Sequence, residues 1–264
     1  MNIPVFKSIA KKLAATSIVL ALAAIFALAQ AAAQGGAPEN HFGRAKKLTA
    51  EGNLKAAAGE YKQAIDAAGG KYAEGHNNLG MVYGMMGDAE QAVREFMTAI
   101  EQRSGDYAEA HYNLGIALSL TDDLAGAERE FNIAIKQKPG EFAEAHGNLG
   151  ILYARKGEAS RAITEFQTAI EQAEGDYAEA HYNLGISLFG MGKIEAATAE
   201  FKDAIDQSEN FPEAHYNLAV AFAKMGKNED AAREFETYLK TAANPRDSDD
   251  VRTRIVELRK ASLK

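Results

Sequence analysis

A five-residue string of the form His-x-Asn-Leu-Gly recurs at nearly constant spacing and constrains the fold more than any other feature of the sequence. Four copies match it fully, and the fifth has Ala219 in place of Gly. The copies are 35, 35, 35 and 34 residues apart and begin at His76, His111, His146, His181 and His215. A fixed period of about 20 to 50 residues is typical of stacked repeats, in which each repeat packs against its neighbours. We therefore predict a tandem array of similar repeats.

Each repeat contains two amphipathic segments separated by a turn. In the second repeat, the first segment has residues of one helical face at steps of three and four, namely Ala73, His76, Leu79, Gly80, Tyr83 and Met86. Gly87-Asp88 interrupts this pattern as a turn. A second helical stripe follows at Ala89, Ala92, Val93, Phe96, Ala99 and Ile100. Each repeat is therefore predicted to be a helix pair.

Small residues and an aromatic residue alternate where the two helices of a pair should cross. Small residues allow close approach, and the aromatic side chain fills the space beside them. One such pair cannot bury its apolar stripe alone, whereas stacked neighbours bury it jointly. The sequence therefore predicts an all-α fold, an α-solenoid of six repeats. Their boundaries are 38–72, 73–107, 108–142, 143–177, 178–211 and 212–245.

These residues resemble the tetratricopeptide repeat (TPR) family. Its pattern runs from an aromatic residue through Leu-Gly, Tyr, a turn Gly, Ala, an aromatic and Ala to a late Pro. The second repeat carries it as His76, Leu79-Gly80, Tyr83, Gly87, Ala92, Phe96 and Ala99, with His in place of the usual Trp. Asp122 replaces a turn Gly, and the late Pro is clear only as Pro139. The resemblance implies a right-handed superhelix whose first helices line a concave face, and a protein or peptide partner.

Both ends of the array depart from the repeat pattern. The first repeat, 38–72, is degenerate, because Arg44-Ala45 stands where the others have Leu-Gly. A terminal repeat has only one neighbour, so it can lose part of the pattern. At the other end, residues 246–264 carry acids at their start and bases at their end, which complements a helix dipole. We predict that this segment is a capping helix over the last pair.

The first 33 residues have the order of an export signal. A basic stretch ending at Lys12 precedes an apolar run, and two Ala-x-Ala sequences follow, ending at Ala29 and Ala33. We interpret 1–33 as a secretory signal peptide and 34–37 as a linker. The alternative is an uncleaved membrane anchor, because the run is close to the roughly 20 apolar residues that a spanning helix needs. Either interpretation places the repeats outside the cytoplasm, as a periplasmic, secreted or membrane-anchored domain.

All six histidines, the earliest being His41, occupy the same position in their repeats. A ladder of metal sites would need neighbouring histidines to share an ion. Equivalent residues of stacked helices lie about 8–10 Å apart, whereas each ligand nitrogen must lie about 2 Å from the ion. We therefore predict no metal site and interpret each His as filling the place of the aromatic residue between the paired helices.

A row of asparagines follows the histidines two positions later. Asn is a mediocre helix former, and here it lies about 100° from the Leu that faces the partner helix. In long superhelices similar to this one, including that of the O-linked GlcNAc transferase, the resemblance implies that such Asn residues hold the backbone of an extended peptide in the concave groove. The alternative is hydrogen bonding to the same helix or to the neighbouring repeat. The candidate peptide-binding residues are Asn78, Asn113, Asn148, Asn183 and Asn217.

Two further rows accompany the asparagines. Tyr112, Tyr182 and Tyr216 would either add stacking surface to the groove or pack repeat against repeat. The second row is a glutamate four positions before each asparagine, which would either favour a basic ligand or stabilise the helix dipole from the first turn. Its members are Glu74, Glu109, Glu144, Glu179 and Glu213.

Composition and motifs exclude several classes of function. A net charge of −8 argues against nucleic-acid binding. The chain has no Cys, so it has neither a thiol nucleophile nor a lipoprotein anchor. It also lacks a Gly-rich phosphate loop, a His-Glu-x-x-His motif and a Gly-x-Ser-x-Gly elbow.

We predict that the protein is a non-enzymatic scaffold without a cofactor, and that it is monomeric or weakly self-associating. It would contact the membrane only through the N-terminal segment, if that segment is not cleaved. The alternative is a self-associating or structural component of a cell-envelope machine such as a pilus or secretion apparatus.

Overall fold

The computed structural model describes residues 36–208, 210–243 and 245–263. These ranges contain thirteen α-helices and no β-strand. The segment interpreted as a signal peptide or anchor, 1–33, lies outside the described residues. Among the helices that are described, none has both the length and the apolar character needed to cross a membrane.

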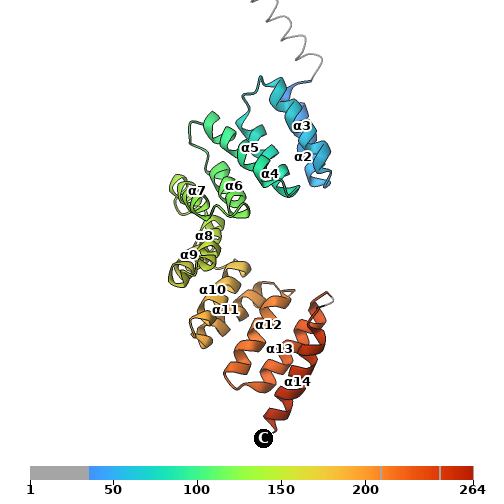
Figure 1. Ribbon diagram of the computed structural model, residues 1–264, viewed down its shortest axis with the longest axis vertical. Coiled ribbons are helices and arrows are strands. Elements are labelled where there is room, and N and C mark those ends of the chain that lie inside the picture. Colours follow the sequence, from blue (N-terminus) through green and yellow to red (C-terminus); the bar gives the residue numbers. More distant parts are fainter. Residues whose placement is uncertain (1–35, 209, 244, 264) are drawn as a thin grey trace, which may run out of the picture. The chain divides into compact units, whose positions relative to one another are not determined.

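Up to Thr241, the helices alternate along the chain as the first and second helices of successive repeats (Figure 1). The first helices are α2 (Pro38–Ala50), α4 (Ala73–Met85), α6 (Ala108–Leu120), α8 (Ala143–Arg155), α10 (Ala178–Gly190) and α12 (Pro212–Lys224). The second helices are α3 (Leu54–Ala67), α5 (Ala89–Gln102), α7 (Leu124–Gln137), α9 (Ala159–Gln172), α11 (Ile194–Gln207) and α13 (Asn228–Thr241). A final helix, α14, spans Ser248–Ser262.

The chain divides into two compact units, and the boundary falls within α6, after Ala117. In the N-terminal unit, α2 pairs with α3, α4 pairs with α5, and α3 packs on α4. In the C-terminal unit, the pairs α8/α9, α10/α11 and α12/α13 follow one another, and each second helix packs on the next first helix. The predicted all-α fold of tandem helix pairs is confirmed in both units.

The close crossing of paired helices depends on a glycine against an aromatic ring. A Cβ atom added to Gly80 would lie 2.7 Å from Cε1 of Phe96, which is too close for two carbon atoms. The same holds for Gly150 with Phe166 and for Gly185 with Phe201, at 2.5 and 2.6 Å. These rings are almost fully buried. The Leu-Gly element of the repeat therefore makes room for the phenylalanine of the second helix.

The turn between the two helices of every repeat has a residue in the left-handed backbone region. Glycine occupies this position in five of the turns, at Gly52, Gly87, Gly157, Gly192 and Gly226, with φ between 73° and 80°. Asp122 occupies it in the third repeat, with φ of 66°. Residues with a Cβ are disfavoured in this region. The turn after α6 therefore holds its backbone at a conformational cost that the other five turns avoid.

Helix α14 packs on α13 at the C-terminal end of the array. Val251 and Ile255 are buried in one cluster with Phe235, Ala219 and Ala232. The hydroxyl of Tyr238 donates a hydrogen bond to Asp247, 2.8 Å away, at the start of α14. The last helix thus covers apolar surface that a following repeat would otherwise bury.

Candidate functional site

The predicted asparagine row lies on the first helices, with each side chain half-buried. In four of the five residues the amide nitrogen donates to a carbonyl of its own helix, one turn earlier. In Asn183 this bond joins Nδ2 to the oxygen of Glu179 over 2.9 Å. Two residues also reach the preceding repeat, since Asn113 donates to Asn77 and Asn217 donates to the Tyr182 hydroxyl. The side-chain N–H groups of these asparagines are therefore engaged in hydrogen bonds within the chain.

An apolar residue follows each of these asparagines at a distance of three positions, a feature that the sequence analysis missed. In the second, fourth and fifth repeats it is Met81, Ile151 or Ile186, with exposed fractions of 44%, 43% and 43%. Because the acidic residue precedes Asn by four positions, all three residues share one helix face. We name this arrangement the first-helix stripe. It comprises Glu74/Asn78/Met81, Glu109/Asn113/Ile116, Glu144/Asn148/Ile151, Glu179/Asn183/Ile186 and Glu213/Asn217/Val220.

Two of the three predicted tyrosines pack among other aromatic rings. Tyr182 lies 4.9 Å from Phe211 between ring centroids, and burial raises the pKa of its hydroxyl. Tyr216 lies 5.4 Å from Phe235 and 5.2 Å from Tyr238. Tyr112 is half-buried in α6. Tyr182 joins two repeats, because its hydroxyl accepts a hydrogen bond from Asn217 of the next repeat. Tyr216 instead packs within its own helix pair and against the apolar cluster that α14 completes.

The histidines lie between the paired helices, but they bind a carboxylate there. His76 Nδ1 is 2.6 Å from Oε2 of Glu95 on the second helix of its pair. The corresponding distance is 2.7 Å for His41, His146, His181 and His215 with Glu60, Glu165, Glu200 and Glu234. A Glu stands 19 residues after every one of the six histidines. Comparing the His and Glu periods would have revealed this pairing from the sequence.

The other ring nitrogen binds the loop before the first helix. His76 Nε2 lies 3.3 Å from the carbonyl oxygen of Gly70, and His111 Nε2 lies 3.0 Å from that of Gly105. A carbonyl and a carboxylate are both acceptors, so the His76 ring donates best to both when it carries two protons. The hydrogen bond to Glu95 accordingly raises the pKa of His76, although burial opposes this effect. Each such His fastens a loop to a helix pair and does not belong to the first-helix stripe.

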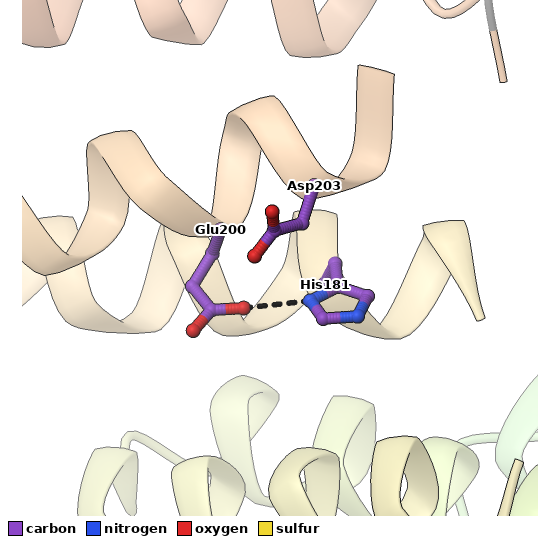
Figure 2. A group of neighbouring side chains, drawn as sticks. All are labelled: His181, Glu200 and Asp203. Carbon is purple, nitrogen blue, oxygen red and sulfur yellow. Dashed lines mark hydrogen bonds and ion pairs between the residues drawn. The ribbon is translucent and has the colours of Figure 1, made fainter. Parts of the chain in front are cut away.

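A group of three potential metal ligands occurs in the fifth repeat. His181, Glu200 and Asp203 place one ligand atom each within 4.8 Å of one another. Figure 2 shows both carboxylates, which come from α11, on the same side of the helix pair as the imidazole of α10. This is the sole group of this kind in the described ranges. The spacing of neighbouring repeats excludes an ion shared between their histidines, but it does not exclude an ion held by a histidine and the carboxylates of one repeat.

Comparison with known families agrees with the geometry of the helix pairs. Models described as TPR repeat or tetratricopeptide repeat match residues 77–142, 122–178, 187–226 and 213–244, which together make up more than half of the chain. The chain therefore belongs to the tetratricopeptide repeat family. The resemblance inferred from the residues is confirmed. No protein of curated function matches the sequence.

Solved structures of other TPR proteins share the fold. The Cut9–Hcn1 hetero-tetramer of the APC/C matches with a TM-score of 0.70 at 14% identity, over 83% of this chain and 43% of that chain. This chain thus spans less than half of that protein. YrrB matches with a TM-score of 0.57 at 20% identity, over 76% and 97% of the two chains. PilF of Pseudomonas aeruginosa matches with a TM-score of 0.65 at 19% identity, over 72% and 85%. At these identities the similarity establishes the fold alone.

Proposed function

We propose that this chain is a non-enzymatic scaffold that binds an extended peptide of a partner protein along the first-helix stripe. The observation that carries the proposal is that the apolar residue beside the asparagine is exposed in the second, fourth and fifth repeats, whereas Ile116 and Val220 are half-buried. Ile151 and Ile186 remain 43% exposed although Leu149 and Leu184, two residues earlier, are almost fully buried. Ile151 and Ile186 lie on helices that contact each other, α8 and α10, so they recur along one surface, and apolar patches of that kind mark interaction sites.

The asparagines offer a way to hold the peptide backbone. Asn183 uses an amide N–H for its own helix, and its Oδ1 atom has no partner among the described residues. An amide oxygen accepts a backbone N–H whatever side chains the peptide carries. The first helices α8, α10 and α12 contact one another in sequence. Asn148, Asn183 and Asn217 therefore recur along one run of adjacent helices, as contacts to an extended chain require.

The remaining positions of the stripe define the chemistry of the peptide. The apolar positions suit aliphatic or aromatic side chains. The acidic positions are all exposed, and they attract basic side chains. YrrB, which shares the fold, is described as a TPR protein with an unusual peptide-binding site. That description supports peptide binding as a use of this fold and does not identify a partner.

Peptides selected from a random library displayed on phage test this proposal. We expect the selected peptides to be rich in apolar and basic residues. Replacing Asn148 and Asn183 together by Ala should weaken the binding of such a peptide about fivefold or more, because each lost hydrogen bond contributes about 0.5–1.5 kcal/mol. Replacing Ile151 and Ile186 together by Ser should also weaken it. Fluorescence anisotropy of a labelled peptide measures both effects.

Val256→Ser provides the control, because Val256 is also apolar and 51% exposed but lies on α14, outside the stripe. This variant should bind the peptide as the wild type does. If both stripe variants keep wild-type affinity and helicity, the stripe is not the binding surface. If the chain instead assembles with itself at micromolar concentration, as light scattering would show, the structural alternative gains support.

We propose that the repeats act outside the cytoplasm. The proposal rests on the order of the first 33 residues, in which a basic start, an apolar run and Ala-x-Ala sites follow one another. N-terminal sequencing of the protein from fractionated cells tests it. Cleavage after Ala29 or Ala33 would support a signal peptide, and an intact Met1 in the membrane fraction would support the anchor. An intact chain in the cytoplasmic fraction would contradict both.

A further inference from the structure

The fifth repeat differs from the other five at one position of its His–Glu pair. Three residues after the paired Glu, it carries Asp203 on the same face of the second helix. The equivalent residues of the other repeats have no carboxylate. They are Gln63, Thr98, Ile133, Thr168 and Thr237. A third ionisable ligand is therefore added in a single place.

The three side chains converge from two helices. His181 Nδ1 on α10 is 2.7 Å from Glu200 Oε2 on α11, and one ligand atom of each residue lies within 4.8 Å of the others. Figure 2 shows the carboxylate of Asp203 beside that of Glu200, near the imidazole. His181 is 9% exposed, whereas Asp203 is exposed. The histidine ligand is thus buried, while the aspartate side of the group is open to solvent.

The imidazole is already oriented as in a metal site. Its Nε2 atom lies 3.3 Å from the carbonyl oxygen of Gly175, which also accepts a hydrogen bond from Gln207. A metal-binding His usually gives its other ring N–H to a carbonyl or carboxylate, which fixes the ring and the tautomer. Here that bond turns the Nδ1 atom toward Glu200.

We propose that His181 Nδ1, Glu200 and Asp203 bind one divalent transition-metal ion of the Zn²⁺ class, with water completing its coordination. One nitrogen and two carboxylate oxygens suit Zn²⁺, Ni²⁺ or Cu²⁺, whereas Ca²⁺ requires six to eight oxygens. Atoms that bind one Zn²⁺ at about 2.0–2.2 Å lie at most about 4.4 Å apart. Small side-chain rotations therefore suffice to close the site. The ion replaces the proton between His181 and Glu200, which is released to solvent.

Isothermal titration of the tag-free, metal-depleted chain with ZnCl₂ tests the proposal. We expect one equivalent of Zn²⁺ to bind. Asp203→Thr should weaken this binding at least tenfold, and it should fold normally, because Thr stands at this place in three other repeats. In the fourth repeat, His146 and Glu165 already form the pair. Thr168→Asp should therefore create a second site and raise the stoichiometry to two.

The gain of a site in Thr168→Asp distinguishes ligand binding from a change in folding, because an unfolded variant cannot gain a specific site. Co²⁺ should give a d–d absorption spectrum in the wild type that is lost in Asp203→Thr. Failure of the wild type to bind Zn²⁺, unchanged Zn²⁺ binding by Asp203→Thr, or equal affinity for Ca²⁺ would each overturn the proposal.

Discussion

Replacing Gly80 by Ala should destabilise the N-terminal unit, whereas the same replacement at Gly84, one turn later in α4, should not. The two glycines share one helix, so the change in backbone entropy is similar at both. They differ in their surroundings. A Cβ at Gly80 would lie 2.7, 2.8 and 3.0 Å from three ring atoms of Phe96, whereas a Cβ at Gly84 would have no atom within 4 Å.

The expected magnitude is the difference between two known effects. Ala is favoured over Gly in a helix by about 0.5–1 kcal/mol, so Gly84→Ala should stabilise the unit by up to that amount. Gly80→Ala gains the same stabilisation from the helix preference of Ala, but overpacking a well-filled core costs about 1–3 kcal/mol. The sixth repeat has Ala219 at this place, fully buried beside Phe235, so a repeat can accommodate the methyl group where its helices are spaced for it. Gly80→Ala should therefore be less stable than Gly84→Ala by about 1–3 kcal/mol.

Urea unfolding followed by circular dichroism measures this difference. The two variants should have similar slopes and different midpoints, and Gly80→Ala should have the lower one. The loss arises from the contact with Phe96, so Gly80→Ala should cost less in a Phe96→Leu background than in the wild type. Equal midpoints for Gly80→Ala and Gly84→Ala would refute the reasoning about the close crossing.

Three further predictions follow from single residues. Gly157→Ala should cost about 1–2 kcal/mol in urea unfolding, because its φ of 77° is disfavoured for any residue with a Cβ. Glu95→Gln should lower the pKa of His76 in an NMR titration, because the hydrogen bond to Glu95 raises that pKa. In the wild type, the stability contributed by the His76–Glu95 pair is complete below the ordinary pKa of His. It is lost as the pH rises through the raised pKa of His76. Burial, followed by the hydrogen bond to Glu128, raises the pKa of Tyr153 to about 12. Its ultraviolet titration should therefore occur at higher pH than that of exposed tyrosines. The stability that Tyr153 contributes should fall between about pH 10 and 12.

The sequence was sufficient to predict the pairing of helices because each element of the pattern has one physical role. Leu79-Gly80 and Phe96 can be assigned to a helix crossing from size and spacing alone, and the structure places them there. Boundaries were harder to predict. Met86 falls on the predicted buried face, yet it is 40% exposed, because α4 ends one residue before it.

The chemistry of the repeated polar residues could be predicted only in part. The position of His76 between helices follows from its place in the pattern. Its bond to Glu95 emerges only when the His and Glu periods are compared, because the two residues are 19 positions apart and on different helices. The asparagines are more ambiguous, since a rotation of the side chain decides whether the amide bonds its own helix or a ligand. The group around Asp203 departs from the period and is therefore missed when only repeated features are sought.

The central claim is that an extended peptide lies on the first-helix stripe, and methyl NMR of Ile-labelled chain tests it most directly. On addition of a selected peptide, the methyl signals of Ile151 and Ile186 should shift, while those of Ile205 on α11 and the buried Ile255 on α14 should stay in place. Shifts confined to Ile205 or Ile255, with Ile151 and Ile186 unchanged at saturating peptide, would contradict the account.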